Sequence, residues 1–71
     1  MEEKTGLDFY KKIISESYKY LKLNGYLCLE IGYNQKADVI KLIQDSGKYH
    51  NEYTKKDLGG NNRIVICQNN V

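Results

Sequence analysis

The feature that most constrains the fold of this chain is an unbroken apolar run near its end, at residues 64–67. Apolar side chains in succession leave a strand no polar face, so such a strand needs apolar neighbours on both sides of its sheet. The run lies inside a strand that we predict over residues 63–68. We therefore expect the last strand of the chain to be central in its sheet.

A second apolar run, at residues 25–32, is bounded by glycines and is too short for a stable helix. It predicts a strand that is buried on both faces. Because side chains alternate along a strand, its faces are Leu27, Leu29 and Ile31 against Tyr26, Cys28 and Glu30. Residues 48–55 mix tyrosines with polar side chains, which predicts a strand at the edge of the sheet.

Apolar residues spaced three and four apart predict an amphipathic helix over residues 6–23. Thr5 is its expected N-cap, and Asn24 and Gly25 are expected to end it because both residues tolerate a left-handed backbone. Its apolar stripe is expected to contain Leu7, Tyr10, Ile14, Tyr18 and Leu21, widened by Phe9, Ile13 and Tyr20.

A second helix is predicted between the run at residues 25–32 and the strand at residues 48–55. Asn34 is its expected N-cap through its side chain, and Gly47 is its expected C-cap. Its inner face is expected to contain Ala37, Ile40 and Ile43, with Val39 and Leu42 beside them.

The predicted order is helix, strand, helix, strand, strand, which indicates an α/β fold. A helix connects the first two strands, so they should run parallel with a right-handed crossover. Residues 57–62 are rich in turn formers and should join the last two strands as a hairpin. With the last strand central, the spatial order is first, third, second, and the last strand is antiparallel to both neighbours.

Composition argues against several classes of protein. A chain of 71 residues suffices for one small domain, and its net charge of +2 is interspersed rather than gathered into a nucleic-acid-binding patch. We expect no membrane segment and no signal peptide, and hence a cytoplasmic location, because apolar runs are short and the N-terminus is polar. Cys28 and Cys67 form no C-x-x-C pair, so we expect no metal site and two buried thiols.

Three segments of the chain resemble one protein family. They are YLKLNGYLCLEIGYNQ at residues 20–35, GLDFYKKI at residues 6–13 and KDLGGNNRIVI at residues 56–66. The most specific combination is Glu30-Ile31-Gly32 followed by Gln35, and then Asp57 and Arg63 before an apolar strand. Together these segments resemble the C-terminal third of the HemK/PrmC family, whose members methylate a glutamine side-chain amide in peptide chain release factors.

The resemblance implies half of a class I (Rossmann-like) methyltransferase sheet, in which the last strand is antiparallel. That family uses S-adenosylmethionine, which it holds at a Gly-rich loop, and grips its substrate with an Asn-Pro-Pro-Tyr motif. This chain has no such loop and no proline. We therefore expect residues 1–71 to be a single C-terminal fragment of a catalytic domain, without the cofactor-binding half, without catalytic residues and inactive alone.

The resemblance also suggests which residues would line the substrate cleft of the intact enzyme. Glu30, Tyr33 and Gln35 lie at or just beyond the carboxyl end of the first strand, where open α/β sheets bind ligands. The alternatives are a solvated or paired acid at Glu30 and ordinary loop packing for the other two. Arg63 has two interpretations as well, a contact with a partner or an ion pair with Asp57 across the hairpin.

A different class of function is a stand-alone interaction or oligomerisation module. The strand at residues 26–31 would have lost one neighbour if the sheet is incomplete, which leaves an apolar edge open to another chain. This hypothesis predicts a homodimer in which the two copies of the strand pair antiparallel across a two-fold axis.

Overall fold

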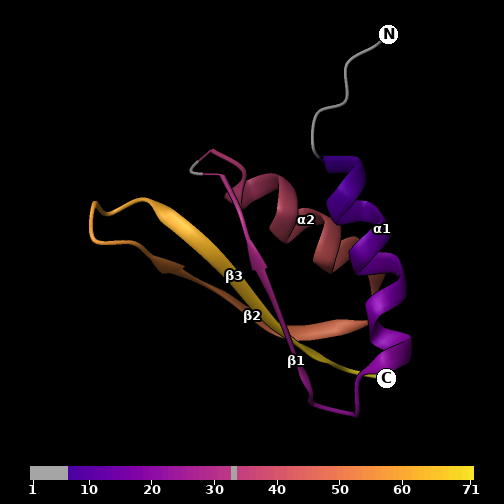
Figure 1. Cartoon of the computed structure of the whole chain (residues 1–71). Coiled ribbons are helices and arrows are strands. Elements are labelled where there is room, and N and C mark those ends of the chain that lie inside the picture. Colours follow the sequence, from indigo (N-terminus) through magenta and orange to yellow (C-terminus); the bar gives the residue numbers. More distant parts are fainter. Residues whose placement is uncertain (1–6, 33) are drawn as a thin grey trace, which may run out of the picture.

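The computed structural model describes residues 7–32 and 34–71, in which two helices pack on a three-stranded sheet (Figure 1). The elements are α1 (Leu7–Ser17), the short 3-10 helix η1 (Tyr18–Tyr20), β1 (Tyr26–Glu30), α2 (Lys36–Ser46), β2 (Tyr49–Lys56) and β3 (Asn62–Asn69). This is the order expected from the sequence. The predicted cap Thr5 lies outside the described residues.

The sheet has the spatial order β1-β3-β2, and β3 is antiparallel to both of its neighbours. This confirms the central place of the last strand, the parallel direction of β1 and β2, and the edge position of β2. Ile66 of β3 lies between Cys28 of β1 and Tyr53 of β2, and Val65 lies between Leu29 and Thr54. The apolar run at residues 64–67 therefore has a neighbouring strand on each side.

The hydrophobic core lies between the helices and one face of the sheet. Leu29, Val65 and Cys67 on that face are buried with Ile14 of α1 and with Val39 and Ile43 of α2. The opposite face has no layer over it within the described residues, and Tyr26 and Tyr53 on it are 61% and 48% exposed. The prediction that β1 is buried on both faces is therefore wrong, because both helices of the chain cover the same face.

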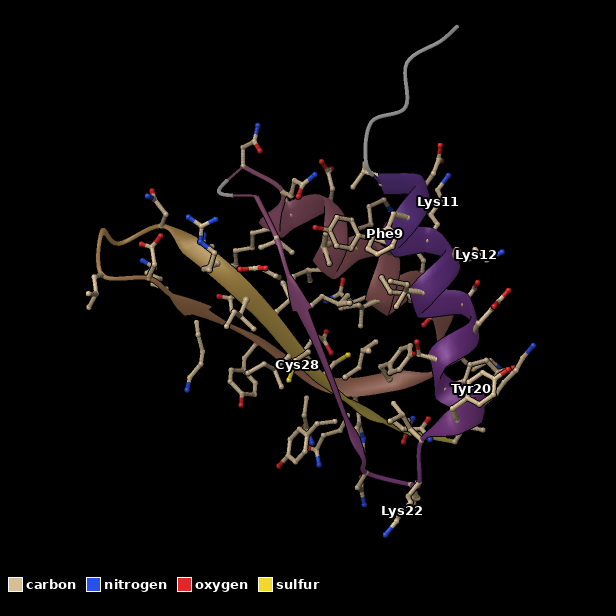
Figure 2. The ribbon with its side chains drawn as sticks, in the orientation of Figure 1. Phe9, Lys11, Lys12, Tyr20, Lys22 and Cys28 are labelled. Atoms are coloured by element: carbon tan, nitrogen blue, oxygen red, sulfur yellow. The ribbon has the colours of Figure 1, made fainter. Side chains whose placement is uncertain are left out.

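The buried stripe of α1 and η1 agrees with its helical spacing, since Leu7, Tyr10, Tyr18 and Leu21 all pack against the core around Ile14. The expected widening of that stripe is wrong for Phe9 and Tyr20, which are 65% and 85% exposed and project from the helical segment (Figure 2). The α-helix also ends earlier than expected, at Ser17, and a 3-10 turn continues it.

Both predicted left-handed turns are present in the backbone. Asn24 has a φ of 65°, and Gly47 closes α2 at its C-cap with a φ of 70°. The N-cap of α2 differs from the prediction, because Gln35 occupies it and no side chain caps the helix there. The expected capping role of Asn34 is therefore wrong.

The face that α2 buries also differs from the prediction. Val39 and Ile43 are fully buried, whereas Ala37 is exposed. The two buried residues are one helical turn apart, so the helix is rotated relative to the expected stripe and points Val39 and Ile43 at the sheet. Ile40 and Leu42 pack only at the margin of the core.

The fully buried Asn69 joins the C-terminal end of the first helical segment to the sheet. Its Nδ2 lies 2.8 to 3.3 Å from four carbonyl oxygens, and its Oδ1 accepts from the backbone N–H of Val71 at 3.1 Å. Three of the four carbonyls belong to Tyr18, Leu21 and Lys22, where the helical segment ends. Because helix ends leave carbonyls without intrahelical partners, this side chain caps them from a strand.

Candidate functional site at the carboxyl end of the first strand

Tyr10 of α1 holds the end of β1 against the helical layer. Its hydroxyl donates to the backbone carbonyl of Glu30 at 2.7 Å, and its oxygen lies 3.4 Å from Oε1 of Gln35. The helical spacing of the sequence placed Tyr10 correctly in the packed stripe, but nothing in that spacing indicated a partner for its hydroxyl. The structure therefore brings Tyr10, Glu30 and Gln35 together where β1 leads into α2.

Glu30 and Gln35, which were both predicted to line one cleft, contribute different groups at this place. Glu30 is exposed and, by the alternation of β1, its carboxylate lies on the open face with Tyr26 and Cys28. It is the backbone of Glu30, rather than its carboxylate, that takes part in the contact with Tyr10. Tyr33 lies outside the described residues, so its predicted role stays a prediction.

Gln35 is held by the turn that it closes. Its Oε1 accepts from the backbone N–H of Gly32 at 2.8 Å, and its own backbone N–H donates to the Gly32 carbonyl at 3.0 Å. A methyl group on Gly32 would lie 3.1 Å from that Oε1, so a glycine lets the amide come this close. The side-chain oxygen of Gln35 therefore points inward and is occupied.

The hairpin turn between β2 and β3 lies at the same end of the sheet as the carboxyl end of β1, since Ile64 pairs with Glu30 and with Lys55. Asp57 organises this turn, because its Oδ1 accepts from the backbone N–H groups of Gly59 and Asn61 at 2.9 and 3.0 Å. Its Oδ2 pairs with Nη2 of Arg63 at 3.1 Å, which confirms the predicted ion pair. Hydrogen bonds from the backbone of Asn61 and from Arg63 lower the pKa of Asp57.

The outer edge of β1 is unpaired within the described residues. Ile31 donates its N–H to Arg63, and Asn69 donates its N–H to the carbonyl of Gly25. Because hydrogen-bonded pairs alternate along an antiparallel ladder, the odd-numbered residues of β1 point their backbone groups at β3. The backbone N–H and C=O of Tyr26 and Cys28 consequently point outward, beside the carbonyl of Glu30 that Tyr10 occupies.

The two cysteines have different surroundings. Cys67 is fully buried, and burial raises the pKa of its thiol to about 12. Cys28 is exposed on the open face, where Figure 2 places it on β1. The expectation of two buried thiols is therefore wrong for Cys28, because no layer of the described residues covers the open face.

Two further observations bear on what the site can bind. No cluster of three or more His, Cys, Asp or Glu residues suited to a metal ion occurs within residues 7–32 and 34–71. None of the helices in this part of the chain is both long and apolar enough to cross a membrane. Separately, Nε2 of His50 lies 2.9 Å from Oδ1 of Asn24, and this contact joins β2 to the turn before β1.

Comparison with known proteins identifies relatives of this chain. The release factor glutamine methyltransferase of Fusobacterium nucleatum is 48% identical to it over 63 residues, which is 89% of the chain and 18% of that protein. The protein of the same name in Aquifex aeolicus is 40% identical over 65 residues, 92% of the chain and 22% of that protein. The chain is a homologue of the release factor glutamine methyltransferases. This confirms the resemblance to the HemK/PrmC family.

A bifunctional methyltransferase of Rickettsia prowazekii is also similar, with 38% identity over 63 residues, 89% of the chain and 12% of that protein. The chain thus spans between an eighth and a quarter of the length of its methyltransferase relatives. No family model and no solved structure matches it.

Proposed function

We propose that this chain is the C-terminal part of an S-adenosylmethionine-dependent methyltransferase that methylates a glutamine side-chain amide in peptide chain release factors. The observation that carries the proposal is the 48% identity to a release factor glutamine methyltransferase over nearly the whole chain. In the intact enzyme the three strands would complete a class I, Rossmann-like sheet. Glu30, Tyr33 and Gln35 would then lie along the wall of the substrate cleft.

Apolar surface on two sides of β1 supports this role. Tyr26 and Tyr53 are exposed on the open face of the sheet, and Phe9 and Tyr20 are exposed on the helical segment. β1 also has an outer edge without a neighbouring strand among the described residues. A small domain has little apolar surface to spare, so these exposed residues fit a segment that abuts more protein.

S-adenosylmethionine is the cofactor that the family implies, and the described residues do not fit it. The junction from β1 to α2 is the place within residues 7–32 and 34–71 where a strand leads directly into a helix, as a nucleotide-type cofactor site requires. It contains one glycine, Gly32, whose N–H is already donated to Gln35. The cofactor therefore belongs to another part of the intact enzyme, and the chain alone is proposed to be inactive.

A chimera tests the proposal. The matched segment of the Fusobacterium nucleatum enzyme is replaced by this chain, and methyl transfer to a release factor is measured. We expect transfer, and we expect none from an otherwise identical protein that lacks the segment. A chimera that binds S-adenosylmethionine but transfers no methyl group would contradict the proposal. Calorimetric titration of the 71-residue chain with S-adenosylmethionine should give no binding at micromolar concentrations.

A second candidate function is self-association through β1, and the outward backbone groups of Tyr26 and Cys28 favour it. Because Tyr10 occupies only the carbonyl of Glu30, the free outward groups run from the N–H of Tyr26 to the N–H of Glu30, and Cys28 lies in the middle of them. An antiparallel two-fold axis there would place the Cys28 residues of two copies opposite each other, about 5.5 Å apart between Cα atoms. That distance is compatible with a disulfide between the copies.

Light scattering and oxidation test this alternative. We expect a dimer at high concentration and a disulfide between two Cys28 residues under mild oxidation. Cys28→Pro should give a folded monomer, because it removes an outward N–H that the sheet does not use. Leu29→Pro is the matched control and should unfold the chain, since its N–H points at β3. A chain that stays monomeric at every concentration rules this candidate out.

A further inference from the structure

The contact with the Gly32 N–H fixes which way the side-chain amide of Gln35 is turned. The Gly32 N–H is a donor, so the atom of Gln35 that faces it at 2.8 Å must be the oxygen. The nitrogen Nε2 therefore points the other way, and it donates to no other described residue. Because no completely buried side-chain nitrogen or oxygen of the described residues lacks a partner, Nε2 is not completely buried and reaches the surface.

The other glutamines of the chain differ in this respect. Nε2 of Gln44 donates to Oε2 of Glu52 at 2.9 Å, and Nε2 of Gln68 donates to the backbone carbonyl of Asn24 at 3.0 Å. Gln35 is half-buried, so its amide is held in place while its two N–H donors remain available. A pre-positioned donor of this kind loses little conformational freedom when it binds an acceptor.

The place of this donor matters as much as its geometry. Gln35 lies in the turn between the carboxyl end of β1 and the start of α2, and open α/β sheets bind their ligands at the carboxyl ends of their strands. The neighbouring Tyr10 and Gly32 fix the backbone on which it stands. Its ligand must offer an acceptor oxygen, such as the carbonyl of a primary amide or a carboxylate.

We propose that Gln35 donates a hydrogen bond from Nε2 to the side-chain carbonyl oxygen of the substrate glutamine and so orients the acceptor amide. This inference rests on the proposed function, which supplies a glutamine as the substrate. The bond orients the amide and does not activate it, because donation to the oxygen leaves the nitrogen no more nucleophilic. A glutamate side chain would accept the same bond, so the choice of an amide is made by other groups.

The first test uses the 71-residue chain itself. The side-chain NH2 signals of its three glutamines are followed by ¹⁵N–¹H spectroscopy during titration with propionamide, a mimic of the glutamine side chain. We expect the signals of Gln35 to move further than those of Gln44 and Gln68, whose donors are occupied. Equal movement of all three would overturn the inference, whether or not the chimera described above is active.

The second test measures kinetics in that chimera with Gln35→Glu. This substitution keeps an oxygen for the Gly32 N–H but replaces the outward donor by an acceptor. We expect kcat/KM for the release factor to fall about 5- to 150-fold, mostly through KM, as for loss of one hydrogen-bonding partner. Asn34→Asp adds the same charge one residue away and should change kcat/KM less than about twofold.

The outcomes of the second test separate the two proposals. An inactive chimera without any substitution counts against the proposed function, while the propionamide titration still decides the role of Gln35. An active chimera in which Gln35→Glu has no effect, or in which Asn34→Asp has the same effect, overturns the role of Gln35. A loss confined to the affinity for S-adenosylmethionine also overturns it, because the acceptor would then be the carboxylate of the cofactor.

Discussion

Replacement of Asn69 by alanine should remove a large part of the stability of this chain. The side chain is fully buried, and its two Nδ2 protons are shared among four carbonyl oxygens while Oδ1 accepts from Val71. Two donated bonds and one accepted bond, at about 1 kcal/mol each, amount to about 3 kcal/mol. A domain of this length has a free energy of unfolding of about 4–11 kcal/mol, so the loss is a large share of the whole.

Urea denaturation followed by circular dichroism measures this effect. For a small domain a loss of about 3 kcal/mol moves the urea midpoint down by about 1–3 M. Asn70→Ala is the matched control, because Asn70 is exposed and its hydrogen bond, from its N–H to the Lys48 carbonyl, is made by the backbone. Asn69→Asp should be worse than alanine, since a carboxylate cannot donate to carbonyls. A loss below about 0.5 kcal/mol for Asn69→Ala, as for an ordinary surface substitution, would refute the reasoning.

Three further predictions concern single side chains. A thiol reagent should label Cys28 quickly in the folded chain and Cys67 only after unfolding, as counted by mass spectrometry. Because folding lowers the pKa of Asp57, its contribution to stability is present above its ordinary value and is lost as pH falls toward the lower one. Asp57→Asn should therefore flatten the decline of the urea midpoint below about pH 4, and an unchanged decline would contradict this. Tyr49→Phe should destabilise the chain by about 1–2 kcal/mol, because the Tyr49 hydroxyl donates a buried hydrogen bond to the backbone carbonyl of Ile14 at 2.8 Å.

Apolar patterning along the chain determined the order of elements and the topology of the sheet. The run at residues 64–67 has no polar face, so its central position follows from the amino-acid sequence alone. The turns at Asn24 and Gly47 were equally local, since they depend on the backbone preferences of those residues. The sequence left Arg63 with two interpretations, and the structure shows the ion pair with Asp57 across the hairpin.

Tertiary structure decided what the elements cover and which polar atoms meet. Both helices pack on the same face, so Tyr26 and Cys28 on the open face are exposed although the apolar run predicted burial. Phe9 is exposed because the packing of α1 leaves its side chain outside the core. Glu30 lies 20 residues from Tyr10, and the three carbonyls of the helical segment that Asn69 contacts lie 47 to 51 residues away from it, so no local pattern could indicate these contacts. Local sequence fixes the periodicity of each segment, whereas burial and hydrogen bonding depend on which distant segments fold against it.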